Sequence, residues 1–218
     1  GCGKTRFALP GPAPVVVLRF DQGTEGVVEE FREEEDKEIR VINYDWAPTD
    51  EDDFSQAMAI DLRDRYIEDF KVACANARTV VLDRETDLWS LFRYAEWGSP
   101  KGDMPKDFDK VNQRMRRYLQ MPKKLTINFV AIQAEKDEWG GATKKTGAKV
   151  RSGFQETPGL MHVELYHERK AGKYYTTVLK CRGKKEAVKG LADQQFENLD
   201  IPTLGQLLFA DSDDSAWF

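Results

Sequence analysis

The chain has 218 residues, of which 40% are hydrophobic and 33% are charged, and this balance indicates a globular protein with one sizeable core. No apolar run approaches the ~18 residues that cross a bilayer, and the three scattered cysteines form no Cys-x-x-Cys motif. These features argue against a membrane protein, a disulfide scaffold and a zinc site, and they favour a reducing, cytoplasmic compartment. Because the net charge is −5, any nucleic-acid surface must be local.

The order of apolar and polar residues predicts strands and helices in alternation. Continuous apolar runs are typical of buried parallel strands, and helical spacing of apolar residues fills the segments between them. The expected strands are 15–20, 39–44, 79–83 and 125–133, and the expected helices are 6–9, 25–34, 54–77, 88–97, 109–120 and 204–208. This alternation predicts an α/β fold with a mostly parallel central sheet flanked by helices.

The remaining segments interrupt this pattern. Residues 160–168 and 173–181 predict a C-terminal β-hairpin that turns near Ala171 and Gly172. Residues 98–107 and the glycine-rich residues 134–154 are expected to be loops, and long loops inside compact domains usually have a function. Residues 1–209 are expected to form the core, and residues 210–218 a flexible acidic tail.

The first five residues, Gly1-Cys2-Gly3-Lys4-Thr5, match the second half of the phosphate-binding loop G-x-x-x-x-G-K-[ST]. In that loop backbone N–H groups surround the phosphates, the lysine reaches the terminal phosphates and the hydroxyl binds Mg²⁺. The motif predicts that Gly1, Gly3, Lys4 and Thr5 bind ATP and that Thr5 is a metal ligand. The first glycine of the motif and the strand that leads into it would precede residue 1. A glycine-rich basic tail is the alternative.

Polar residues at three strand ends are the other candidates. Asp83 follows the apolar run 80–82, as in a Walker B strand, where a carboxylate holds the Mg²⁺ shell. Gln133 ends the next expected strand, where an amide can sense the γ-phosphate. Lys180 and Arg182 share one strand face, where two cations can neutralise charge on a transferring phosphoryl group. An ordinary strand-end glutamine and a solvated basic edge are the alternatives for the last two features.

These features, in this order, resemble the ATPase core of the RecA-like recombinases, and most of all that of phage-encoded single-strand-annealing or recombinase ATPases. The resemblance covers roughly residues 1–209 and is carried by short motifs. It implies that Lys4 and Thr5 bind phosphate and Mg²⁺, and that Asp83 is the Walker B carboxylate. It further implies that Gln133 is the switch glutamine, that Lys180 and Arg182 reach the ATP of a neighbouring subunit, and that residues 98–107 and 134–154 are DNA-binding loops.

The hydrolytic base is the point at which the chain departs from that family. The family has a catalytic glutamate just after the strand that corresponds to residues 15–20. Here Asp21, Glu25 and Glu85 are candidates to polarise the attacking water, and none is in clear register. The identity of the base therefore stays open, and slow turnover is expected.

The expected loop at residues 134–154 has a composition suited to single-stranded nucleic acid. Its glycines allow close backbone approach, and its cations can contact phosphates, which makes binding sensitive to salt. Trp139 can stack on an unpaired base, which is worth roughly 1–3 kcal/mol, or can pack beneath the loop. The predicted DNA contacts are Trp139, Lys144, Lys145, Lys149 and Arg151.

The sequence supports one main hypothesis about the function of the protein and leaves two alternatives open. The first is a Mg²⁺- and ATP-dependent ATPase of phage recombination that binds single-stranded DNA in the cytoplasm of a bacterial host. ATP between subunits implies a homo-oligomeric ring or filament, and a single-strand-binding protein is a further candidate partner. The alternatives are a P-loop kinase for a small molecule, with the basic loop as its lid, and a non-hydrolysing, nucleotide-dependent DNA-binding scaffold.

Overall fold

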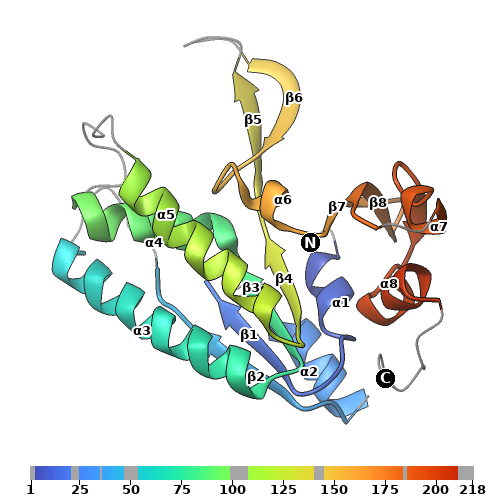
Figure 1. The fold of residues 1–218 in the computed structure, drawn as a ribbon, viewed down its shortest axis with the longest axis horizontal. Coiled ribbons are helices and arrows are strands. Elements are labelled where there is room, and N and C mark those ends of the chain that lie inside the picture. The colour runs from blue at the N-terminus through green and yellow to red at the C-terminus, as the bar shows by residue number, and fades with distance from the viewer. Residues whose placement is uncertain are drawn as a thin grey trace.

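A computed structural model describes residues 3–20, 25–34, 36–46, 54–98, 108–139, 145–183 and 186–210 of the chain. A four-stranded parallel sheet with the order β2-β1-β3-β4 forms its centre (Figure 1). The strands are β1 (Val15–Arg19), β2 (Ile39–Asn43), β3 (Thr79–Asp83) and β4 (Asn128–Ile132). The predicted α/β fold with a parallel sheet flanked by helices is confirmed, and all four strands lie within the segments expected to form them.

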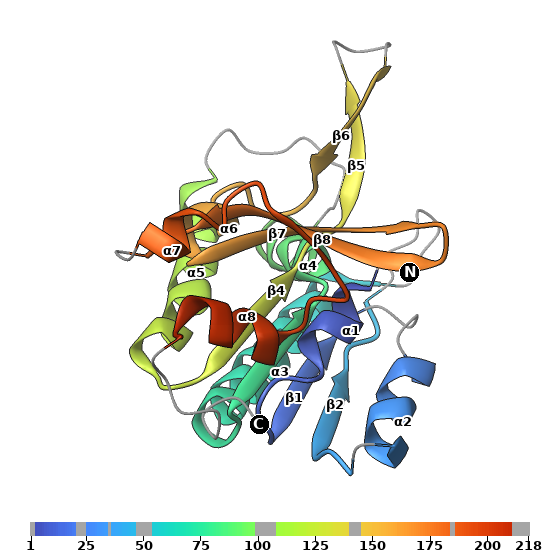
Figure 2. The same ribbon diagram turned by 90° about the vertical axis from the view of Figure 1, so that its right-hand side faces the viewer.

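Helices cover both faces of this sheet, as the views in Figures 1 and 2 show together. One face carries α3 (Gln56–Asn76), α4 (Glu85–Trp97) and α5 (Asp109–Gln120), and the other carries α1 (Lys4–Ala8), α2 (Glu25–Glu34) and α8 (Ile201–Leu208). Along β1, Val16 and Leu18 belong to the first core while Val15 and Val17 belong to the second. Because successive side chains alternate between faces, an uninterrupted apolar strand supplies both cores.

Two smaller antiparallel sheets complete the described fold. The predicted C-terminal hairpin is confirmed as β7 (Val163–Lys170) and β8 (Lys173–Cys181), and β9 (Gln195–Glu197), which was not predicted, adds a third strand. The other sheet consists of β5 (Glu135–Trp139) and β6 (Lys145–Arg151). The short helices are η1 (Met121–Lys124), α6 (Thr157–Leu160) and α7 (Glu186–Lys189).

The prediction of one long loop at residues 134–154 is wrong. The segment forms the β5–β6 hairpin, which projects from the body of the molecule (Figures 1 and 2). Every described side chain of β6 except the half-buried Val150 is exposed, so the strand has no buried face. Without a buried face the sequence lacks the apolar alternation by which half-buried strands are predicted. Cross-strand ion pairs, with Asp137 between Lys145 and Lys149, take the place of a core.

Two further predictions concern segments of which the structure describes only one residue each. The expected loop at 98–107 is described only at Gly98, which ends α4 with a φ of 73°. The expected acidic tail is described only at residue 210. Within the described ranges, no helix has both the length and the apolar character needed to cross a membrane.

Candidate functional site

The candidate site lies at the carboxyl end of the sheet, where α1 meets β3. Gly3 precedes α1 with a φ of 89°, and a Cβ placed there would lie 2.7 Å from Cδ1 of Tyr174. A glycine is therefore required at this position. Two residues later, Oγ1 of Thr5 donates to Oδ2 of Asp83 across 3.4 Å. Two motifs that are 78 positions apart in the sequence thus meet at one point.

Asp83 is buried at the end of β3 and is flanked by a second polar residue. It is in register with Arg19 of β1, which in turn is in register with Asn43 of β2. Register partners in parallel strands share a face of the sheet, and Nε of Arg19 donates to Oδ1 of Asn43 at 2.8 Å. Arg19 was not among the predicted site residues. Its signal was present as the one charged residue in the apolar run 15–20.

Glu85, the first residue of α4, links the end of β4 to the segment that follows β6 and to α6. Its carboxylate is fully buried and accepts hydrogen bonds from Nε2 of Gln133 at 2.7 Å, from the backbone N–H of Phe154 at 3.2 Å and from Oγ1 of Thr157 at 3.3 Å. Gln133 also donates to the backbone carbonyl of Phe154 at 3.2 Å. The predicted switch glutamine therefore contacts both Glu85, two residues after the end of β3, and the segment that leaves β6.

Thr86, the second residue of α4, forms hydrogen bonds with both ends of the β5–β6 hairpin. Oγ1 of Thr86 donates to the carbonyl of Ser152 at 2.8 Å and accepts from the N–H of Ala134 at 2.9 Å. Ser152 also donates its N–H to the carbonyl of Ala134 at 2.8 Å. The first residues of α4 thus hold both ends of the hairpin, and α4 begins two residues after Asp83.

Burial raises the pKa of Glu85 to about 7, and the hydrogen bonds from Gln133, Phe154 and Thr157 only partly oppose this shift. The sequence proposed Glu85 as one of three groups that could polarise water. Because its oxygens are enclosed and already accept three hydrogen bonds, the geometry favours a positioning role for Glu85 over direct contact with water.

Gly153 is the residue that makes this close packing possible. Its φ is 117°, and a Cβ there would lie 2.4 Å from Oε2 of Glu85. We expect Gly153→Ala to lower the free energy of unfolding by about 1–3 kcal/mol, since it adds backbone strain and displaces Glu85. Chemical denaturation measures this loss. Gly147→Ala is the matched control, because Gly147 has a φ of 84° with open space around its Cβ position. Equal losses in the two variants would contradict the contact with Glu85.

Lys180 and Arg182 both contact α6. The ammonium of Lys180 donates to the carbonyl of Pro158, and Nη2 of Arg182 donates to the carbonyl of Gly159 at 2.9 Å. Burial and the neighbouring Arg182 lower the pKa of Lys180. Arg182 lies just beyond the end of β8. Contact of this pair with a nucleotide on a neighbouring subunit stays a prediction.

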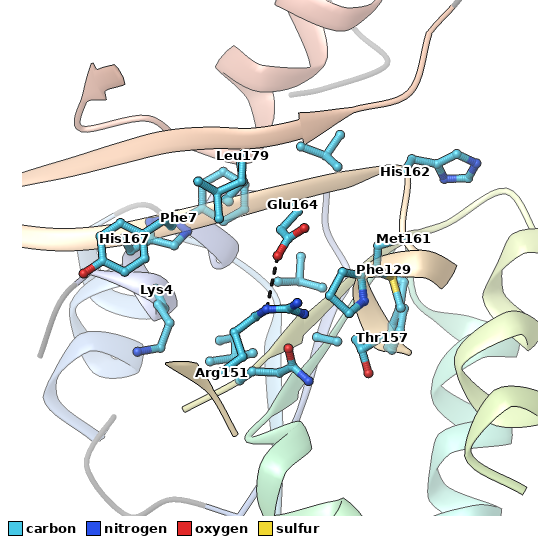
Figure 3. Close-up of a pocket in the computed structure, with 18 of the residues that line it drawn as sticks. Lys4, Phe7, Phe129, Arg151, Thr157, Met161, His162, Glu164, His167 and Leu179 are labelled. Carbon is cyan, nitrogen blue, oxygen red and sulfur yellow. Dashed lines mark ion pairs between the residues drawn. The ribbon is translucent and has the colours of Figure 1, made fainter. Parts of the chain in front are cut away.

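Two lysines of β6 form ion pairs with one carboxylate on β5. Lys149 is paired with Asp137, and Lys145 also forms an ion pair with Asp137. The two ammonium groups lower the pKa of Asp137 to about 2. Nε of Arg151 lies 3.3 Å from Oε1 of Glu164 on β7, the contact drawn as a dashed line in Figure 3. Both lysine side chains are still 57% exposed, which leaves them accessible to a phosphate backbone.

Several predicted residues fall outside what the structure describes. Gly1, Asp21 and Lys144 do so entirely, and the side chains of Glu25 and Trp139 do so as well. Glu25 is the first residue of α2, and Trp139 is the last residue of β5. Their predicted roles in ATP binding, catalysis and DNA binding stay predictions.

The histidines do not form a metal site in the described part of the chain. Among its residues, no group of three or more His, Cys, Asp or Glu side chains could hold a metal ion. Nδ1 of His167 lies 3.0 Å from Oγ1 of Thr176, and burial, with a smaller effect of Lys4, lowers the pKa of His167 to about 4. His167 is therefore neutral near pH 7. A hydroxyl–carboxylate pair such as Thr5 and Asp83 is instead the oxygen-ligand chemistry that suits Mg²⁺ completed by phosphates and water.

The chain matches no protein-family model, and no curated protein matches it significantly. The class of protein that the fold defines is an α/β protein with a parallel sheet and polar residues at the carboxyl end of its strands. In open α/β sheets this end is where ligands bind.

Proposed function

We propose that the protein is a Mg²⁺- and ATP-dependent ATPase that binds single-stranded DNA and acts in phage recombination. The observation that carries the proposal is the 3.4 Å contact between Thr5 and Asp83. A G-K-T sequence and an aspartate at a strand end are each weak signals when they stand alone. Their meeting at the carboxyl end of a parallel sheet is the arrangement that P-loop ATPases use.

Each residue of this site has a definite task in the proposal. Lys4 supplies positive charge to the terminal phosphates, and Thr5 and Asp83 hold Mg²⁺ through the hydroxyl and the carboxylate. The metal would supply charge neutralisation between the β- and γ-phosphates. Lys180 and Arg182 would approach the same phosphates from a neighbouring subunit, which makes the active form an oligomer.

The contacts of Glu85 and Thr86 suggest how nucleotide and DNA binding are coupled. Gln133 and Glu85 form a hydrogen bond of 2.7 Å, and both contact the segment that leaves β6. A nucleotide that reorients the amide of Gln133 would change these contacts at the base of the β5–β6 hairpin. The hairpin carries Lys145 and Lys149, whose release from Asp137 would let them bind DNA phosphates.

The test is ATP hydrolysis measured with and without single-stranded DNA, on protein extended at its amino terminus to a complete G-x-x-x-x-G-K-T loop. We expect DNA to stimulate turnover, and we expect the stimulation to fall steeply as salt is raised, because phosphate contacts release counterions. In the double variant Lys145→Ala/Lys149→Ala the stimulation should require more DNA while turnover without DNA is unchanged. Equal turnover with and without DNA at low salt would contradict the proposal.

A non-hydrolysing scaffold is the second candidate, and the enclosure of Glu85 favours it. Of the three carboxylates considered as the base, Glu85 is buried and hydrogen-bonded, and the side chains of the other two lie outside the described part of the chain. In the same assay a scaffold would bind ATP and DNA without turnover. A small-molecule kinase would bind ATP and transfer phosphate only to an added acceptor.

A further inference from the structure

Arg19 is a buried cation to which the proposed function gives no task. Of the lysines, arginines, aspartates and glutamates in the described part of the chain, three are buried, namely Arg19, Asp83 and Glu85. Burial raises the pKa of Glu85 to about 7, so this carboxyl group is only partly ionised near neutral pH. Side chains of these types are almost never fully buried unless an opposite charge lies nearby. The charge of Arg19 is therefore to be considered together with that of Asp83.

Arg19 and Asp83 lie next to each other on one face of the central sheet. They are register partners at the carboxyl ends of β1 and β3, and neighbouring strands are about 4.8 Å apart. Two residues earlier, Val17 and Val81 both belong to the core that α1 covers. Because side chains alternate along a strand, Arg19 and Asp83 are directed to that same face, from which Thr5 of α1 contacts Asp83.

A hydrogen bond holds the side chain of Arg19 at this end of the sheet. Nε of Arg19 donates to Oδ1 of Asn43 at 2.8 Å, and Asn43 is the register partner of Arg19 on β2. Only 8% of Arg19 is exposed. Its positive charge is therefore fixed beside Asp83, and water and salt screen it much less than they screen a surface cation.

The charge of Arg19 affects what the carboxylate of Asp83 can bind. A carboxylate that stands alone attracts a divalent cation, but a neighbouring buried guanidinium cancels that charge and repels the incoming metal. The phosphates of a nucleotide reverse this balance, because they bring several negative charges to the site. The charge of Lys4, which adjoins Thr5 in α1, acts in the same direction as that of Arg19.

We propose that Arg19 is a positioning residue that acts through Asp83: it prevents Thr5 and Asp83 from binding a free divalent cation, so that Mg²⁺ enters the site only together with nucleotide phosphates. The substrate of the site is then the metal–nucleotide complex. This inference rests on the proposed function, because it takes Thr5 and Asp83 as the metal ligands.

Binding of Mn²⁺ alone tests the proposal on the whole chain without nucleotide, with the electron paramagnetic resonance signal of the free ion as the readout. Mn²⁺ prefers the same oxygen ligands as Mg²⁺. Arg19→Met and Arg19→Gln both remove the charge, and glutamine keeps a donor for Asn43. We expect each to bind Mn²⁺ at least about tenfold more tightly than the wild type. Arg19→Lys, which keeps the charge, should bind as weakly as the wild type.

Two further measurements show where the metal binds and whether the variants are folded. In the double variant Arg19→Gln/Asp83→Asn the gain in affinity should disappear, because the carboxylate that holds the metal is gone. Thermal unfolding reports that each variant is folded. A merely structural role of Arg19 would not raise the affinity for a metal at Asp83, and it would not be rescued by the charge of lysine.

Three outcomes would overturn the proposal. One is equally tight binding of Mn²⁺ by the wild type and both neutral variants, which would leave the metal site and the proposed function intact. Another is a gain that persists after Asp83→Asn, since the metal would then bind elsewhere. The third is no binding of Mn²⁺ by any variant. Titration with ATP and Mg²⁺ then separates the two hypotheses, because binding that depends on the metal keeps the proposed function and an absence of binding rejects it as well.

Discussion

Replacing Lys4 with alanine is expected to lower ATP turnover at least about 100-fold in protein that carries a complete phosphate-binding loop. Lys4 begins α1 one residue after Gly3 and one before Thr5, whose hydroxyl contacts Asp83. In the proposed site its ammonium would stabilise the charge that develops on the transferring phosphoryl group, and loss of one such interaction typically costs 10²–10³ in rate. Steady-state release of inorganic phosphate measures the effect.

A matched lysine variant separates this effect from a general loss of positive charge. Lys124, in η1, is exposed and distant from α1 in the sequence. Lys124→Ala should keep wild-type turnover, and thermal unfolding should show that both variants are folded. If Lys4→Ala turned over ATP as fast as Lys124→Ala, the assignment of the G-K-T sequence to phosphate binding would be wrong.

Replacing Glu85 with glutamine is expected to change how stability depends on pH. The pKa of Glu85 is raised from 4.5 to about 7, chiefly by burial. The stability linked to this shift is fully present below pH 4.5 and is lost as pH rises through 7, because the folded state disfavours the ionised carboxylate. Glutamine does not titrate. The free energy of unfolding of Glu85→Gln, minus that of the wild type, should therefore grow by about 2–3 kcal/mol between pH 4.5 and pH 8.

Urea unfolding at a series of pH values gives this difference directly. His167, whose pKa is lowered to about 4, gives a contribution of the opposite sign, and it cancels because both proteins contain it. Asp137→Asn is a useful second comparison, since the low pKa of this carboxylate comes from Lys145 and Lys149 and not from burial. A Glu85→Gln difference that stays constant from pH 4.5 to pH 8 would show that the buried carboxylate does not titrate as described.

The two inner strands of the central sheet could be predicted because they are buried on both faces. Each of the five residues from Val15 to Arg19 is buried, and so is each from Thr79 to Asp83, which leaves continuous apolar runs in the sequence. The proximity of Thr5 and Asp83 could be predicted for a different reason. Both match short motifs that, in proteins that bind Mg²⁺ and ATP, contact the same ligand.

The remaining features depend on contacts that no local pattern encodes. The β5–β6 hairpin has no buried face, so its strands resemble a polar loop in sequence. The three hydrogen bonds of Glu85 join positions 48 to 72 residues apart. Arg19 was visible as a charge in an apolar run, but its alignment with Asp83 follows only from the register of β1 and β3.

Titration of the loop-completed protein with ATP, in the presence of Mg²⁺ and again with the metal chelated, tests the central claim most directly. If Thr5 and Asp83 hold Mg²⁺ against the phosphates, ATP should bind at least about tenfold more tightly with the metal, since a tenfold difference corresponds to about 1.4 kcal/mol. The advantage should disappear in Asp83→Asn. Binding that is equally tight without Mg²⁺ and unchanged in Asp83→Asn, or no binding of ATP at all, would contradict it.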